Sequence, residues 1–341
     1  MRWGYWLGSG LAGLVILLIV TVGAAWWALV APLNGAAEPV GFTVDAGQHA
    51  AEITAALDQA GFVRSQLALR GYLRVTHQTL KAGRYTLSKS GSSIQNVGSI
   101  LQGVVAERQV TIPEGLRLSE VAALLERQGI VPASDFIAAA HYRPSVVALP
   151  ASYNLKADTF LEGFVFPDTY RFAADATATM VVKKMVQTFV ERTAQLSLSY
   201  DQLILASIVE REAKFDDDRA TIAGVYANRL AAHLPLQSNP TVEYARANAN
   251  CGPQPVEQCT LTDWWPQPKP ADFHDLDSPY NTYRVLALPP RPIANPGLKS
   301  LKAAVNPAKH DDKFFVTDTD GHAHFAKTFD EHTKNVQRYL K

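Results

Sequence analysis

The chain has 341 residues, of which 47% are hydrophobic and 19% charged, with 32 basic and 32 acidic side chains. This composition is that of a folded protein of about two or three domains, and it excludes a largely disordered chain. Because the formal net charge is zero, the composition gives no electrostatic reason to expect nucleic acid as a partner.

The N-terminal segment predicts a membrane span. Residues 6–30, "WLGSGLAGLVILLIVTVGAAWWALV", lack charge and are long enough to cross a hydrocarbon core of about 30 Å. A cleaved signal peptide has a shorter apolar run, of roughly 7 to 15 residues, so we expect a retained anchor. Arg2 precedes the span and the first basic residue after it is Arg64. The positive-inside rule therefore places residues 1–5 in the cytoplasm and the chain after the span on the other side of the membrane, which in a bacterium is the periplasmic side of the inner membrane.

Two segments after a linker at residues 31–41 predict an internal repeat. Residues 42–63, "FTVDAGQHAAEITAALDQAGFV", align without a gap with residues 110–131, "VTIPEGLRLSEVAALLERQGIV". Each copy predicts a strand, a glycine turn, an amphipathic helix and a second glycine that ends the helix. The segment "KAGRYTLSKSGSSIQNVGSIL" between them predicts a further strand, turn and helix. We therefore expect paired small α+β modules.

The pattern changes after Pro150. Helices are predicted for residues 177–196 and 219–232, and a capping box at Ser199 and Gln202 begins another helix between them. The segments "LPLQSNPTVEYA" and "SPYNTYRVLALPPRPIANPG" are rich in Pro, Asn and Tyr and are predicted to be loops. Binding groups are commonly placed on such loops, so the predicted fold class is α+β with a mixed helical and loop domain at the C-terminal end.

One helix, within "ILASIVEREAKF" at residues 204–215, carries two glutamates with different surroundings. At about 100° per residue, Glu212 lies near the centre of the apolar arc, whereas Glu210 lies on the opposite side with Lys214 four residues later. We therefore expect Glu210 to be a solvated acid. Burial against apolar neighbours disfavours a charged carboxyl, so we expect a raised pKa at Glu212, as a general acid requires. The alternative is that Glu212 bends out to water or meets an arginine.

Two cysteines, Cys251 and Cys259, enclose the short loop "CGPQPVEQC". In an oxidising compartment such a spacing favours a disulfide. A metal site is the alternative, but two thiols without a nearby pair of His or Cys are an incomplete ligand set. His322 and His324 could both ligate from one face of a strand, although "GHAHF" favours a surface turn.

Six motifs make the chain recognisable; in chain order they are "KAGRYTL", "LEGFVFPDTYRF", "ASIVEREA", "LQSNPTVEYA", "YNTYRVLALPPRPIANPG" and "GHAHFAKTFDEHTKNV". Together they resemble the membrane-anchored endolytic murein transglycosylases, the YceG-like family also called MltG. The resemblance extends from about residue 40 to the end. It implies a LysM-like region at residues 42–150 and a catalytic domain at residues 151–341. The second acid of the motif "SIVE-x-E", which is Glu212 here, would be catalytic. This chain departs from the family at Asn239, where Asp is usual, and in the cysteine loop.

The resemblance also implies the reaction. Glu212 would first protonate the oxygen between N-acetylmuramic acid and N-acetylglucosamine, and then help the sugar's own 6-hydroxyl to close onto C1, leaving a 1,6-anhydromuramyl end. Such an enzyme needs no cofactor and no metal. Its partners would be the membrane, peptidoglycan strands and cell-wall synthases such as penicillin-binding proteins, and its cleavage would end glycan elongation.

Six residues are candidate substrate-binding groups: Gln237, Asn239, Thr241, Tyr244, Asn281 and Tyr283. The alternative interpretation is that they fix turns and cover the core. Two alternative functions remain open. One is a non-catalytic, membrane-anchored peptidoglycan-binding scaffold. The other is a hydrolytic muramidase, which by the common routes needs a second carboxylate that the sequence does not reveal.

Overall fold

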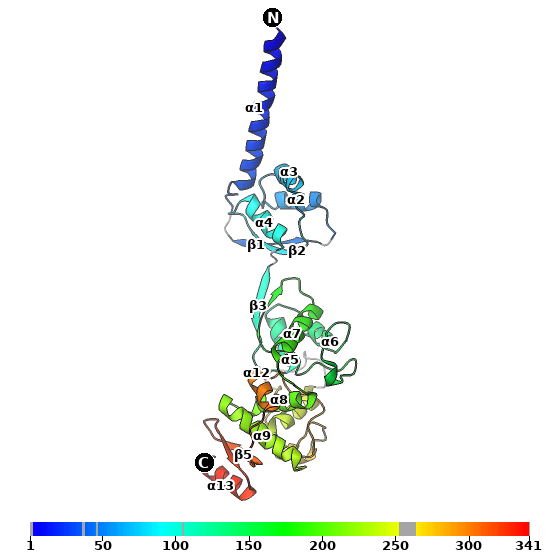
Figure 1. The fold of residues 1–341 in the computed structure, drawn as a ribbon, viewed down its shortest axis with the longest axis vertical. Coiled ribbons are helices and arrows are strands. Elements are labelled where there is room, and N and C mark those ends of the chain that lie inside the picture. The colour runs from blue at the N-terminus through cyan, green and yellow to red at the C-terminus, as the bar shows by residue number, and fades with distance from the viewer. Residues whose placement is uncertain (1–2, 36–37, 46, 104–105, 252–263, 341) are drawn as a thin grey trace. The chain divides into compact units, whose positions relative to one another are not determined.

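The computed structural model describes residues 3–35, 38–45, 47–103, 106–251 and 264–340 (Figure 1). The chain divides into two compact units: residues 1–108 with 173–175, and residues 109–172 with 176–341. Helices and short strands alternate along both units, and every sheet in the described ranges is two-stranded. The predicted α+β class is confirmed.

The first unit begins with α1 (Trp3–Val30). Its segment Ala12–Val30 has a mean hydropathy of 2.4 and is the one stretch, among the helices described, that is long and apolar enough to cross a membrane. Most of its apolar side chains are not covered by other parts of the protein, whereas those of a core helix are buried. This exposure is consistent with a single-pass membrane anchor.

The globular part of the first unit packs helices against one hairpin. Strand β1 (Pro39–Val44) pairs antiparallel with β2 (Gly83–Ser88), and α2 (Ala50–Gln59), α3 (Gln66–Thr76) and α4 (Ser93–Gln102) complete the unit. The core contains Leu57, Leu69, Tyr85, Leu87, Val97 and Ile100. The strand, turn and helix predicted between the two repeat segments are therefore β2 and α4.

The two repeat segments have matching local structure, although they lie in different units. Strand β3 (Glu107–Thr111), whose residues from Gln109 onward belong to the second unit, precedes α5 (Leu118–Arg127), as β1 precedes α2. Gly61 and Gly129, at equivalent positions after the two helices, have φ values of 76° and 64°. A left-handed residue at this position ends a helix, and glycine adopts it without a steric penalty.

The second unit is mostly helical. Strand β3 neighbours β4 (Thr169–Ala173), and β5 (Phe314–Thr317) pairs antiparallel with β6 (Ala323–Ala326). Its remaining helices are α6 (Ala133–Ala139), α7 (Ala178–Thr193), α8 (Tyr200–Glu212), α9 (Asp216–Ala231), α10 (Asn239–Cys251), α11 (Asp272–Asp275), α12 (Leu298–Val305) and α13 (Phe329–Tyr339), with a 3-10 turn at Ala151–Tyr153.

Helix α8 runs through the core of the second unit. The predicted capping box is confirmed: Ser199 accepts from the backbone N–H of Gln202, whose side chain accepts from the N–H of Ser199. Residues 203–209 are all buried, and α8 contacts α9, α10 and α12. A helix covered on every side has no solvent face, so its polar residues need partners within the protein.

One predicted loop is wrong. The segment "NPTVEYA" is not a loop but the start of α10, in which Asn239 and Pro240 occupy the first two positions. Proline is tolerated in the first helical turn, where its missing N–H would have no partner within the helix. The expected disulfide between Cys251 and Cys259 lies outside the part of the chain whose side chains are described.

Candidate active site

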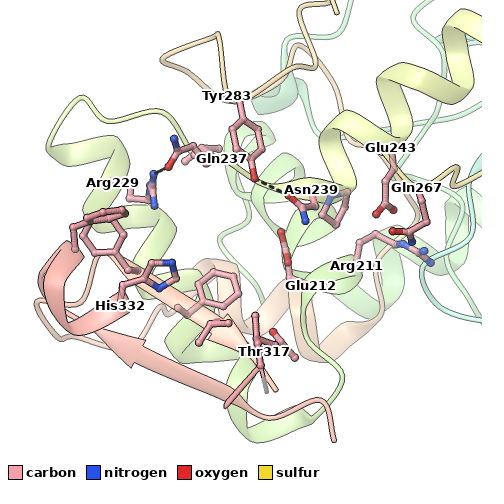
Figure 2. A pocket seen from close by; sticks show the side chains of 17 residues that line it. Arg211, Glu212, Arg229, Gln237, Asn239, Glu243, Gln267, Tyr283, Thr317 and His332 are labelled. Carbon is pink, nitrogen blue, oxygen red and sulfur yellow. Dashed lines mark hydrogen bonds between the residues drawn. The ribbon is translucent and has the colours of Figure 1, made fainter. Parts of the chain in front are cut away.

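A cavity of about 800 Å³ opens in the second unit, where the C-terminal end of α8 meets α9, α10 and the β5–β6 hairpin (Figure 2). Glu212, the last residue of α8, lines it together with Gln237, Asn239 and Tyr283. Residues of β5 and α13 line the opposite wall, including Phe314, Phe329 and His332, together with Leu340 just after α13. Helix termini and a hairpin thus enclose a site of the size typical of a ligand pocket.

The Glu212 carboxyl is held by two hydroxyl groups. Tyr226 Oη donates to Oε1 over 2.7 Å and Ser238 Oγ donates to the same oxygen over 2.6 Å. Burial raises the pKa of Glu212, against these two hydrogen bonds and the nearby charge of Arg211, which lower it. Both bonds go to one oxygen, so Oε2 is the oxygen that can carry a transferable proton.

The two hydroxyls are themselves fixed. Tyr226 lies on α9, fully buried, with its ring edge-on to Phe315 at a centroid distance of 5.9 Å. Ser238 N–H donates to Thr282 Oγ1 over 3.1 Å, and Thr241 Oγ1 donates to the Ser238 carbonyl over 2.7 Å. Glu212 is therefore held by groups whose positions are already determined by packing and hydrogen bonding.

Three of the predicted substrate-binding residues meet at the cavity. Tyr283 Oη donates to Asn239 Oδ1 over 2.6 Å, as Figure 2 shows. The Gln237 amide oxygen accepts from Arg229, a second cavity residue that also donates from Nη1 to the Lys313 carbonyl over 3.0 Å. These amide and phenol groups flank Glu212 and can hydrogen-bond to a polar ligand.

The other three predicted substrate-binding residues do not line the cavity. Thr241 and Asn281 are fully buried, and Tyr244 is 6% exposed. The Asn281 side chain donates to the backbone carbonyls of Asp272 and Leu276, over 3.1 Å and 3.0 Å. Tyr244 packs under the Arg117 guanidinium, which lies 4.2 Å from its ring centroid. Their contacts fix turns and cover the core, which places them behind the site rather than in it.

The cavity also contains a carboxyl that the sequence analysis did not identify. Glu243 lies on α10, and its pKa is raised to about 7, chiefly by burial; the charge of Arg211 opposes the rise and that of Glu212 adds to it. Arg211 follows Glu210 on α8 and stacks on Trp265 at 3.8 Å. Since Asn239 and Glu243 are four residues apart, their side chains share one face of α10. Recognising α10 as a helix would have indicated this second acid.

Comparisons with known proteins identify the family of the chain. Residues 42–338 match the YceG-like family. The chain belongs to the YceG-like family. The endolytic murein transglycosylase of Streptococcus pneumoniae (strain ATCC BAA-255 / R6) is 29% identical over 328 residues, covering 86% of this chain and 57% of that protein. The enzyme of the same name from Bacillus subtilis (strain 168) is 28% identical over 321 residues, covering 88% and 85% of the two chains.

A solved structure supports the same assignment. The crystal structure of a yceG-like protein from Listeria monocytogenes superposes with a TM-score of 0.53 at 29% sequence identity, covering 88% of this chain and 99% of that one. This YceG-like chain spans little more than half the length, 57%, of the Streptococcus pneumoniae relative.

The first acid of the motif in this YceG-like protein is not solvated, so the interpretation of Glu210 was wrong. Its side chain is only 5% exposed and pairs with Arg219 Nη1 over 3.2 Å. Its other oxygen accepts from the Gly297 N–H over 2.9 Å, while Lys214 donates instead to the Asp320 carbonyl. The polar side of α8 faces α9 and the start of α12, so Glu210 is buried there as a structural acid.

Proposed function

We propose that this protein is an endolytic peptidoglycan lytic transglycosylase, which cleaves the bond between N-acetylmuramic acid and N-acetylglucosamine and leaves 1,6-anhydromuramyl ends. The observation that carries the proposal is the Glu212 carboxyl, which lines the cavity, is poorly solvated and has one oxygen held by two hydroxyls. Family membership and the names of the relatives support the same chemistry.

The proposed reaction uses Glu212 twice. In the first step the proton on Oε2 passes to the glycosidic oxygen, the C1–O bond breaks, and the N-acetylglucosamine end leaves with a hydroxyl. In the second step the Glu212 carboxylate accepts the proton of the muramyl 6-hydroxyl as that oxygen bonds to C1. The acid is regenerated and no water is consumed. A raised pKa serves the first step because the carboxyl begins protonated.

Tyr226 and Ser238 serve both steps. Each donates to Oε1, so they stabilise the carboxylate that forms after the first proton transfer and keep Oε2 oriented toward the cavity. Gln237, Asn239 and Tyr283 are proposed to bind the amino sugars, with the aromatic rings of the opposite wall packing on sugar faces. An amide at Asn239 retains hydrogen bonding without the charge that Asp would bring.

The presence of Glu243 in the cavity favours the muramidase alternative, since a hydrolase needs a second carboxyl in the same cavity. The two reactions differ in product: hydrolysis leaves a free reducing end and transglycosylation leaves an anhydro end. The scaffold alternative does not explain the position of Glu212, because a protein that only binds glycan needs no poorly solvated acid.

The remaining elements of the proposal concern location and organisation. Helix α1 would anchor the chain in the inner membrane, with its N-terminus in the cytoplasm and residues 42–341 in the periplasm. Residues 42–150, with their two repeat segments, would form a LysM-like region that binds glycan or acts as a spacer, and residues 151–341 would form the catalytic domain. A periplasmic position beside cell-wall synthases would allow cleavage to terminate growing strands.

The test is Glu212→Gln in the full chain, with turnover of purified peptidoglycan measured at equal concentrations of folded protein. Glutamine retains an oxygen for Tyr226 and Ser238 but cannot supply the proton, so turnover should fall by roughly 10² or more. The matched control is Glu191→Gln, an exposed acid of α7, which should keep wild-type turnover. A folded Glu212→Gln protein with wild-type turnover would refute the assignment.

A further inference from the structure

Two carboxyls share the cavity, and the proposed reaction uses only one of them. Glu212 reaches it from the end of α8 and Glu243 from α10, and Arg211 lines it beside them (Figure 2). No hydrogen bond or ion pair to the Glu243 carboxyl is formed by the residues that the structure describes. Burying a carboxyl in part without such support costs free energy, which indicates a role for Glu243 at the site.

The other ionisable groups of the cavity do not change charge between about pH 7 and pH 9. The charged and titratable groups around Glu212 are Arg211 from α8, Tyr226 and Arg229 from α9, Glu243 from α10, Tyr283 from its loop and His332 from α13. Burial raises the pKa of both tyrosines, that of Tyr283 to about 12. Burial and then Arg229 lower the pKa of His332 from 6.5, so it is neutral in this range.

Burial raises the pKa of the other two groups, Glu212 and Glu243, that of Glu243 to about 7. The charge of Glu212 is one of the causes that raise the pKa of Glu243. Because the repulsion between two like charges is mutual, an ionised Glu243 opposes ionisation of Glu212 in turn. Arg211 acts in the opposite direction, because a nearby positive charge favours ionisation of each carboxyl.

We infer that Glu243 is a positioning residue for the reaction: facing the same cavity from α10, its charge keeps the proton on Glu212 at the start of the cycle, and Arg211 opposes it. This inference rests on the proposed function, since it assigns Glu243 an effect on the acid of that reaction. Glu243 does not touch the reacting atoms in this account and acts only through Glu212.

The experiment is the pH dependence of kcat/KM for the full chain on purified glycan strands, comparing the wild type with Glu243→Gln and Glu243→Asp. Activity requires protonated Glu212, so it falls on the alkaline side. Removing the negative charge of Glu243 makes ionisation of Glu212 easier, so the alkaline limb of Glu243→Gln should move to lower pH by about 0.5 to 1 unit. Glu243→Asp keeps the charge and should restore the limb toward the wild-type position.

Two further variants sharpen the test. Arg211→Gln, with folding checked by thermal melting, should move the limb in the opposite direction, to higher pH, because a positive charge has been removed. Glu191→Gln on α7 should not move it. A purely structural role for Glu243 would change stability and leave the limb in place.

The inference is overturned if the alkaline limb of Glu243→Gln stays in place or moves to higher pH. It is also overturned if the folded variant loses activity by about 10² at every pH, because Glu243 would then act on the substrate itself. Product analysis keeps the two proposals separate. If wild-type products carry free reducing ends, the proposed function fails, whereas an unmoved limb alongside anhydro ends refutes only the inference about Glu243.

Discussion

Replacing Glu210 tests whether the first acid of the motif is structural. In Glu210→Ala, Arg219 loses its ion-pair partner at 3.2 Å and the Gly297 N–H loses its acceptor at 2.9 Å. Arg219 is only 10% exposed, so its charge remains in a poorly solvated position. Removing one partner of a buried pair costs about 3–5 kcal/mol, and we expect a loss near the lower end because Asp216 still pairs with Arg219.

Glu210→Gln is the graded comparison. An amide oxygen can still accept from Gly297 or Arg219, so the free energy of unfolding should fall by only about 1–2 kcal/mol. Chemical unfolding of the detergent-solubilised chain measures both losses, and Glu191→Ala on the surface of α7 should change the value by less than about 0.5 kcal/mol. If Glu210→Ala were as stable as Glu191→Ala, the account of Glu210 as a buried structural acid would be wrong.

Three other predictions concern a buried acid, a close backbone contact and the membrane topology. Burial raises the pKa of Glu162 from 4.5 to about 8, so the contribution of Glu162 to stability is lost as pH rises across that range. The variant Glu162→Gln should therefore flatten the fall in thermal stability between pH 5 and pH 8. An unchanged slope would contradict this. A Cβ at Gly224 would overlap the Ala308 carbonyl oxygen. In a denaturant titration, Gly224→Ala should therefore lower the free energy of unfolding by about 1–3 kcal/mol. A variant of wild-type stability would contradict the close packing at this position. A C-terminal alkaline phosphatase fusion should be active in intact cells, since residues 42–341 are proposed to be periplasmic. If that fusion is inactive while a reporter that works only in the cytoplasm is active at the same C-terminus, the proposed topology is reversed.

The features predicted from the sequence are those that neighbouring residues determine. The Ser199 cap, the helix that follows it and the position of Glu212 on its apolar arc depend on spacing within about a dozen residues. The raised pKa of Glu212 also agrees with the prediction, since burial is its largest cause.

The features that were missed depend on residues distant in the chain. Helical angles place Glu210 on the solvent side of α8, but they do not reveal that Arg219 and the Gly297 N–H cover it. Glu243 is not predicted because its segment has the composition of a loop, in which side chains four residues apart need not share a face. Thr241 and Asn281 have polar side chains like those of binding residues, but their hydrogen bonds go to the backbone that holds the site.

The central claim is that Glu212 directs ring closure without water, and mass analysis of the sugar ends released from purified peptidoglycan tests it most directly. The wild-type protein should release strands with 1,6-anhydromuramyl ends, and Glu212→Gln should release almost none. Wild-type products that carry only free reducing ends, with oxygen from labelled water incorporated at C1, would contradict the account and identify a hydrolase.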